Sequence, residues 1–325
     1  MQNECFKNAS VSVLGGGGFI GEALVRRLSG MAGVLRVIDK SVDYRKYQQL
    51  QNLEVYEGDV RDPSKIGPAV KNCSIVFNLV GQGGHLESMA NPHQDLDNNV
   101  CAQLTILEAC KTHSPGAHVI FASTRQIYGV PECLPVPEDH PVNPVDINGI
   151  NKLTAERYHL LHAQMCTLRA TVLRLTNTYG PGMRTSGPNS TFLGTWIRQI
   201  LDGQPISIFG DGSNVRDMTH VEDVVNAFLK AAEDPLKTNK DVFNIGSGIP
   251  TTLREIADSL VSLSPSLTRI QFLPFPQPLK EIDIGSYVSD ISKFTNRTAW
   301  TPQISLHDGL RTTLNSFGLL EGRPS

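Results

Sequence analysis

The sequence predicts an α/β protein with a doubly wound parallel sheet and a smaller α/β lobe. Apolar runs typical of buried strands alternate with helix-periodic segments along most of the first 245 residues. The first run, at 11–14, passes through a glycine turn into an amphipathic helix that reaches residue 28. A stretch rich in Gly and Pro at 180–189 then marks the start of the second lobe. Repeats of this kind form parallel sheets that bind ligands at the carboxyl ends of their strands.

The glycine turn is the most informative local feature. Gly15, Gly18 and Gly21 have the G-x-x-G-x-x-G spacing, and Phe19 and Ile20 open the helix that follows. Glycines at these places let the backbone turn tightly and approach a pyrophosphate, while the helix N-terminus offers free N–H groups to an anion. A plain structural turn is the alternative, but the flanking strand and helix favour a dinucleotide site.

Acidic residues follow the next two predicted strands. Asp39 ends the strand 34–39, where a carboxylate binds the ribose diol of NAD and repels the extra phosphate of NADP. Lys40, directly after it, leaves NADP open. Asp59 follows the strand that begins at Leu53, and its carboxylate could accept a hydrogen bond from adenine. The positions of these acids therefore favour NAD.

The rest of the chain continues the same alternation. Further strands are expected at 75–81, 117–123, 171–175, 206–209 and 242–245. Longer helices are expected at 95–111, 148–168 and 191–201. From these elements we expect a dinucleotide-binding domain at 1–176 and 214–245, and a substrate-binding lobe at 177–213 and 246–325.

Composition excludes several other classes of protein. The net charge is −3, from 29 basic and 32 acidic side chains, so no strong field recruits nucleic acid or an anionic membrane. The 6 cysteines form no C-x-x-C pair and do not cluster with histidines, so no metal is expected. The segment 1–10 has no apolar signal-peptide core, and no run is apolar enough to span a membrane. We therefore expect a cytoplasmic protein.

Five further motifs, at 58–62, 97–100, 121–129, 173–181 and 287–293, join the glycine turn in one pattern. With them the chain resembles the extended short-chain dehydrogenase/reductase family, in its nucleotide-sugar epimerase/dehydratase branch, of the UDP-glucose 4-epimerase type. The resemblance implies a Rossmann-type fold, NAD as cofactor, a nucleotide-diphosphate sugar as substrate, and a homodimer through the helices 95–111 and 148–168. The cofactor-binding residues that it implies are Gly15, Gly18, Phe19, Ile20, Asp39, Asp59, Val60, Leu79, Asn99 and Lys152.

The resemblance also locates the catalytic residues, with one departure. Thr124 matches the residue that hydrogen-bonds the reacting sugar hydroxyl, and Lys152 matches the lysine of the family's Tyr-x-x-x-Lys pair. In the family this lysine holds the nicotinamide ribose and lowers the phenol pKa, but here Asn148 replaces the tyrosine. A carboxamide does not ionise near neutral pH, so Asn148 cannot shuttle a proton as a phenol does.

Three explanations of this substitution are open. Another group acts as the base, with Asp146, His85 and Glu87 as candidates because they lie near the pocket-forming segments. Turnover could instead persist slowly with water as the relay, because general acid–base assistance contributes only about 10²–10⁴-fold. The third explanation is a protein that binds cofactor and nucleotide without turnover.

Substrate-binding residues follow from the same resemblance. Asn177 and Arg216 match residues that contact the sugar diphosphate, and the planar fork of a guanidinium suits phosphate. For Arg216 the alternative is a surface ion pair with Asp217. Lys280 stands where the family usually has another phosphate-binding arginine, and Glu87 completes the expected substrate contacts.

The residue after Thr124 favours epimerisation over dehydration. It is Arg125, whereas the family's 4,6-dehydratases have an Asp-Glu pair there. We therefore expect an NAD-dependent epimerase-like enzyme that oxidises a ring carbinol to a keto intermediate and returns the hydride, with a base other than tyrosine. The alternative is a catalytically impaired protein of the same fold that binds NAD and a nucleotide sugar. The nucleotide, the sugar and the inverted carbon stay open.

Overall fold

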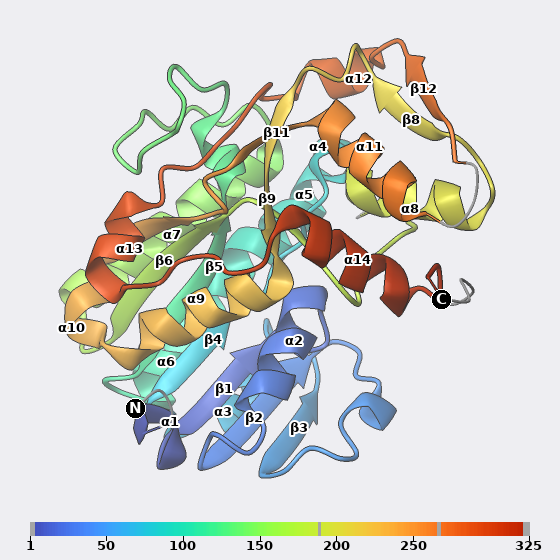
Figure 1. Cartoon of the computed structure of the whole chain (residues 1–325). Helices are drawn as coiled ribbons and strands as arrows, with labels where there is room; N and C mark the ends of the chain where they lie inside the picture. The colour runs from blue at the N-terminus through green and yellow to red at the C-terminus, as the bar shows by residue number, and fades with distance from the viewer. Residues whose placement is uncertain (1–3, 188–189, 265–267, 321–325) are drawn as a thin grey trace.

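The computed structural model describes residues 4–187, 190–264 and 268–320 (Figure 1), so the outer limits of the expected domains, 1 and 325, lie outside the described residues. Its main element is a seven-stranded sheet in the order β10-β6-β5-β4-β1-β2-β3, in which every neighbouring pair is parallel. The strands are β1 Ser10–Leu14, β2 Val34–Asp39, β3 Leu53–Glu57, β4 Ile75–Asn78, β5 His118–Thr124, β6 Arg169–Leu175 and β10 Asp241–Ile245. The doubly wound, Rossmann-type fold is therefore confirmed.

Most of these strands are buried along nearly their whole length because helices cover both faces of the sheet. The covering helices are α2 Phe19–Leu28 and α9 Val221–Glu233 on one face, and α3 Pro63–Val70, α6 Ala102–His113 and α7 Ile147–Met165 on the other. Their apolar stripes form two cores, one on each side of the sheet. Sheet and helices together form a rigid base from which the loops at the carboxyl edge project.

The helix expected at 95–111 is interrupted. It begins as α5 (Pro92–Leu96), passes through one turn of π-helix at Asp97–Cys101, and continues as α6. Single π-helical turns of this kind often occur at functional sites. Here the turn carries Asn98 and Asn99, which both hydrogen-bond Gln82 in the loop after β4.

The smaller lobe has its own sheets and its own core. β11 (Pro250–Thr252), β9 (Val215–His220) and β7 (Asn177–Tyr179) form a three-stranded sheet, and β12 (Ile270–Leu273) pairs with β8 (Ile206–Phe209). β9 thus pairs within the smaller lobe, although it falls in the range 214–245 that we assigned to the first domain. The rest of that range, α9 and β10, joins the large sheet, and the domain boundaries stay a prediction.

Shorter elements connect these parts. They are α1 Glu4–Lys7, α4 His85–Ala90, α8 Phe192–Leu201, α10 Pro235–Thr238, α11 Leu253–Leu263, α12 Gln277–Lys280, α13 Ser292–Thr298 and α14 Leu306–Ser316, with 3₁₀ turns at Tyr44–Lys46 and Arg125–Tyr128. In the described part of the chain, no helix combines the length and the apolar character needed to cross a membrane.

Candidate active site

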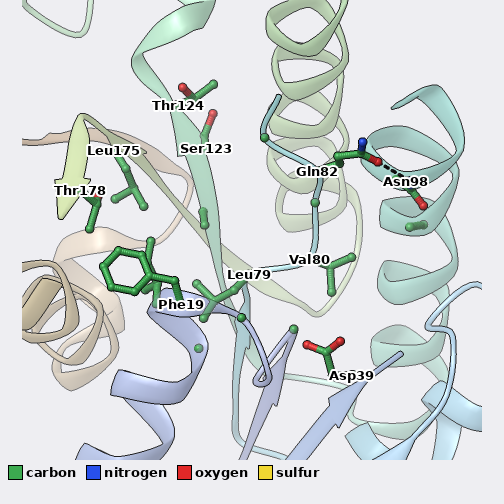
Figure 2. Close-up of a pocket in the computed structure, with 18 of the residues that line it drawn as sticks. Phe19, Asp39, Leu79, Val80, Gln82, Asn98, Ser123, Thr124, Leu175 and Thr178 are labelled. Atoms are coloured by element: carbon green, nitrogen blue, oxygen red, sulfur yellow. Dashed lines mark hydrogen bonds between the residues drawn. The ribbon is translucent and has the colours of Figure 1, made fainter. Parts of the chain in front are cut away.

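A cavity of about 750 Å³ opens at the carboxyl ends of the central strands. Figure 2 shows its wall, with Phe19 at the start of α2, Asp39 at the end of β2 and Thr124 at the end of β5. The cavity lies where the strand order reverses between β1 and β4, which is the usual ligand site of an open parallel sheet. The expected cofactor-binding residues line this cavity, with the exception of Asn99 and Lys152. Thr124 and Asn177, which were expected to contact the substrate, line it as well.

The glycine turn has the shape of a phosphate cradle. Gly15 has φ +78°, a conformation that favours glycine, and a Cβ on Gly21 would collide with the Gly15 carbonyl oxygen. No side chain caps the N-terminus of α2. The first N–H groups of the helix and its positive dipole end are therefore available to an anion in the cavity.

The carboxylate of Asp39 is held at the cavity edge by the glycine turn. Its Oδ2 accepts a hydrogen bond from the Gly17 N–H at 2.9 Å. The neighbouring Lys40 is engaged elsewhere, with its Nζ 3.6 Å from Asp59 Oδ2 and 3.0 Å from Asn98 Oδ1. Asp59 also binds Arg61, and this hydrogen-bonded pairing lowers the pKa of Asp59 to about 2. The free oxygen of Asp39 can therefore accept from a ribose hydroxyl.

Lys152 lies just behind the cavity wall. Its Nζ donates a hydrogen bond to the Ala122 carbonyl of β5 at 3.1 Å. Burial lowers the pKa of Lys152 to about 8, and the nearby carboxylates of Asp95 and Glu156 oppose this effect. Gly81 leaves the room that the ammonium needs, because a Cβ there would lie 2.5 Å from Nζ.

Asn148 is turned away from the cavity. It is 2% exposed, and its Nδ2 donates to the Gln82 carbonyl at 2.6 Å and to Asp95 Oδ2 at 3.3 Å. Asn99 holds the same Gln82 backbone by accepting from its N–H at 3.1 Å. Neither Asn148 nor Asn99 lines the cavity. The two amides instead fix the loop between β4 and α4, which does.

Two of the candidate bases meet each other. His85, which lines the cavity, has its Nδ1 2.7 Å from Oδ2 of Asp146, at an angle outside hydrogen-bond range. The Asp146 side chain has no exposed surface, and its other contacts are with the Gly149 N–H at 2.6 Å and Gln126 Nε2 at 2.9 Å. A histidine beside a carboxylate that is itself anchored is a common arrangement for proton transfer.

The remaining expected residues lie outside the cavity wall. Glu87 accepts a hydrogen bond from Asn91 Nδ2 at 2.6 Å within α4, and Lys280 is exposed on α12. Arg216 is nearly buried, donates to the Gly285 carbonyl at 2.7 Å and lies 3.4 Å from Asp283 Oδ1. Asp217 bonds other groups, so the ion pair considered for Arg216 does not form. The structure thus separates Glu87, Arg216 and Lys280 from the cavity wall that carries Thr124.

One cavity residue was not expected to take part in the site. The sequence pattern identified Arg125 only as a departure from the dehydratases, yet it lines the cavity next to Thr124. Its Nη1 is buried and has no hydrogen-bond partner among the described residues. A charged residue directly after a buried parallel strand was the available signal, because such residues lie at the ligand-binding edge of the sheet.

Together these features define a dinucleotide-binding protein of the α/β class. The chain belongs to the NAD dependent epimerase/dehydratase family, whose model matches residues 11–246. NAD is accordingly its cofactor.

Relatives of the chain match it over most of their length. It is 28% identical to a UDP-glucose 4-epimerase of Lactobacillus helveticus, over 90% of this chain and 92% of the relative. Among solved structures, the UDP-glucose 4-epimerase of Thermotoga maritima, solved with UDP-glucose, has a TM-score of 0.87 at 29% identity, covering 95% of this chain and 98% of that one. MoeE5 in complex with UDP-glucose and NAD has a TM-score of 0.84 at 29% identity and covers 95% and 98%.

The residues at the site fit this cofactor. A Cβ on Gly21 would collide with the backbone of Gly15 and Gly16, so only glycine lets the helix start pack against the turn and direct its N–H groups to a pyrophosphate. Asp39 is placed for a ribose diol, and Lys152 retains donors beyond its bond to Ala122. When bound, NAD would accept a hydride and return it. The protein supplies binding, orientation and proton transfer.

Proposed function

We propose that the protein is an NAD-dependent epimerase-like oxidoreductase that acts on a nucleotide-diphosphate sugar through a transient keto intermediate. The observation that carries this proposal is the meeting of Thr124 and the His85–Asp146 pair at one cavity, with Lys152 behind its wall. Several relatives over nearly the whole chain are nucleotide-sugar epimerases, including a CDP-paratose 2-epimerase of Salmonella typhi at 26% identity, and others are UDP-glucuronic acid decarboxylases.

Each residue has a role in this proposal. Thr124 donates a hydrogen bond to the reacting sugar oxygen, and Lys152 holds the nicotinamide ribose. The amide of Asn177 faces the diphosphate, supported by its buried Oδ1, which has no partner among the described residues. Arg216 on β9 also lies outside the cavity wall, and its guanidinium would neutralise the diphosphate only after it leaves Gly285 and Asp283. Glu87 and Lys280, which lie outside the cavity wall, would reach substrate only through a movement of α4 or α12.

The missing tyrosine is replaced in this proposal by His85. Its imidazole accepts the proton of the sugar hydroxyl as the hydride leaves the same carbon, which converts the carbinol to a ketone. The same proton returns to the oxygen when the hydride comes back to the opposite face of the carbon. Asp146 keeps the ring in place and stabilises the imidazolium, while Asn148 has only the structural role of fixing the loop at Gln82.

The experiment incubates the purified protein with NAD and a panel of UDP-, GDP-, CDP- and dTDP-sugars. Isomer formation is followed by chromatography, and reduced cofactor by its absorbance. We expect one sugar to be converted into its epimer without net NAD consumption. Absence of turnover with the whole panel, alongside measurable NAD binding, would contradict the proposal.

A second candidate function is a catalytically impaired protein that binds NAD and a nucleotide sugar. It is favoured by one observation, the engagement of Asn148 with Asp95 and Gln82 instead of the cavity. In that case nucleotide sugars bind without isomerisation, and Asn148→Tyr raises the rate strongly. If His85 is the base, the same substitution brings little gain.

We also propose a cytoplasmic homodimer that packs through α7 and its neighbour α6. On α7 the apolar side chains of Ile150, Leu161 and Met165 are 50%, 50% and 77% exposed. Their spacing puts them on one face of the helix, and such faces are commonly covered by another helix. Light scattering on the eluting protein tests this, and a monomer at micromolar concentration would contradict it.

A further inference from the structure

Arg125 is a cation in the cavity wall that the protein itself leaves unpaired. It is the first residue after β5, and its guanidinium carbon lies 5.4 Å from the ring centroid of Tyr287. In the described parts of the chain its side chain donates no hydrogen bond and forms no ion pair. Stacking on an aromatic ring orients a guanidinium without satisfying its N–H donors.

Such an arrangement is costly unless something else binds the guanidinium. Burial lowers the pKa of Arg125 to about 10, and the positive charge of Arg216 adds to this effect. Arg125 therefore stays charged at neutral pH although its side chain is half-buried and its Nη1 is removed from water. Buried charges in proteins are normally paired or fully hydrogen-bonded because the loss of hydration is expensive.

The two carboxylates whose charges act on Arg125, those of Asp217 and Asp283, already have other partners. Asp217 accepts hydrogen bonds from the backbone N–H groups of Ser247, Gly248 and Ser289. Asp283 lies within 3.4 Å of Arg216. No carboxylate of the described residues pairs with Arg125, so its donors are available to an anionic group of a ligand in the cavity.

The position of Arg125 in the chain indicates which part of the ligand pairs with its guanidinium. It directly follows Thr124, which contacts the reacting sugar oxygen under the proposed function on which this inference rests. The diphosphate is assigned to Asn177, which lines the same cavity from β7 of the other lobe. We propose that Arg125 is a specificity-determining residue that binds a carboxylate on the sugar ring, so that the substrate is a nucleotide-activated uronic acid.

The chemistry of the two groups supports this assignment. A guanidinium offers parallel N–H donors in one plane, and a carboxylate offers two oxygens at the matching separation. A neutral hydroxymethyl group at the same place would leave the charge of Arg125 uncompensated. The site should therefore discriminate between an acidic sugar and its neutral analogue.

The test measures dissociation constants by calorimetry in the presence of NAD, with UDP-glucuronate, UDP-glucose and UDP as probes. We expect the wild type to bind UDP-glucuronate on the order of 10- to 100-fold more tightly than UDP-glucose, as charge-assisted hydrogen bonds allow. Arg125→Gln should remove this preference and leave the affinity for UDP unchanged. Arg125→Lys should keep part of it.

Arg184→Gln is the matched control, because Arg184 also lines the cavity but on the side of Asp39 and Gly17. It should not change the preference for the uronate. NAD affinity and melting temperature check that each variant is folded.

Three results would overturn the inference. Equal binding of UDP-glucuronate and UDP-glucose by the wild type would contradict this inference and leave the proposed function standing. An equal loss of UDP, UDP-glucose and UDP-glucuronate binding in Arg125→Gln would assign the residue to the diphosphate instead. Failure of these probes, and of the GDP-, CDP- and dTDP-sugars of the turnover panel, to bind a protein that binds NAD would overturn the proposed function as well.

Discussion

Asn148 donates a hydrogen bond from Nδ2 to Oδ2 of Asp95 at 3.3 Å, and both side chains are buried. Asp95 is an internal carboxylate that also accepts from Asn151 Nδ2 at 2.8 Å. Asn148, where the resemblance implies a tyrosine, is therefore part of a buried polar cluster beside the loop after β4. The consequences of this arrangement can be measured separately from catalysis.

Replacement of Asn148 should mainly lower the stability of the folded protein. In Asn148→Ala the Gln82 carbonyl and Asp95 each lose a donor, so we expect the free energy of unfolding to fall by about 1–3 kcal/mol. Urea denaturation measures the change, and Asn151→Ala, which also removes a donor to Asp95, is the matched control. A stable variant with abolished turnover would instead indicate a direct catalytic role for Asn148.

Replacement of His85 should mainly lower the catalytic rate constant kcat. In His85→Gln the imidazole is lost, so we expect kcat to fall by about 10²–10⁴-fold while the affinities for NAD and nucleotide sugar change little. Steady-state kinetics and calorimetry measure the two effects. His93→Gln is the control, because His93 is exposed on α5 and does not line the cavity. An unchanged kcat in His85→Gln would rule out His85 as the base.

Gly81 should tolerate no side chain. A Cβ there would lie 2.5 Å from Lys152 Nζ and 2.7 Å from Asn99 Oδ1, so Gly81→Ala must displace the lysine. We expect NAD binding to weaken by roughly tenfold or more and the protein to lose about 1–3 kcal/mol of stability from overpacking. Gly83→Ala, in the same loop, meets nothing within 4 Å and should change neither quantity. Identical behaviour of the two variants would show that the position of Lys152 does not govern NAD binding.

Lys152 should make stability depend on pH in a defined window. Its pKa is about 8 in the folded protein against 10.5 for a free side chain, so the unfolded chain binds more protons between these values. The contribution of Lys152 to the free energy of unfolding therefore rises with pH from about 8 to 10.5, and below about 8 it is unfavourable by about 3 kcal/mol.

The measurement compares the wild type with Lys152→Met by denaturant unfolding from pH 7 to 10. The stability of the wild type should rise relative to the variant as the pH passes 8. A constant difference between the two proteins across this range would mean that the lysine keeps an ordinary pKa in the folded state.

The sequence was sufficient for the features that depend on local pattern. Alternating apolar runs and helix-periodic segments predicted the parallel sheet, because a strand buried on both faces needs apolar residues throughout. The spacing of Gly15, Gly18 and Gly21 between a strand and a helix predicted the cradle, and Asp39 at a strand end predicted the ribose contact. In each case the residues concerned are close together in the chain, or their place at a strand end is enough to locate them.

The sequence was less informative about which distant side chains share the cavity. Glu87, Arg216 and Lys280 were expected at the substrate and lie outside the cavity wall, while Arg125 was not assigned and lines it. For Glu87 and Lys280 the reason is that α4 and α12 are short elements on loops, and the direction of a loop depends on what packs against it.

By itself, then, the sequence determined the fold class and predicted the dinucleotide cradle, and its resemblance to the family implied a lysine without the usual tyrosine. Only the tertiary structure decided that Asn148 turns to Asp95, that His85 meets Asp146 across about 60 residues of chain, and that Arg125 is left unpaired. These three facts depend on the order of strands in the sheet and on the packing of α4, α5 and α7. Local periodicity does not predict the strand order or this helix packing, because contacts between distant segments form only when the whole core closes.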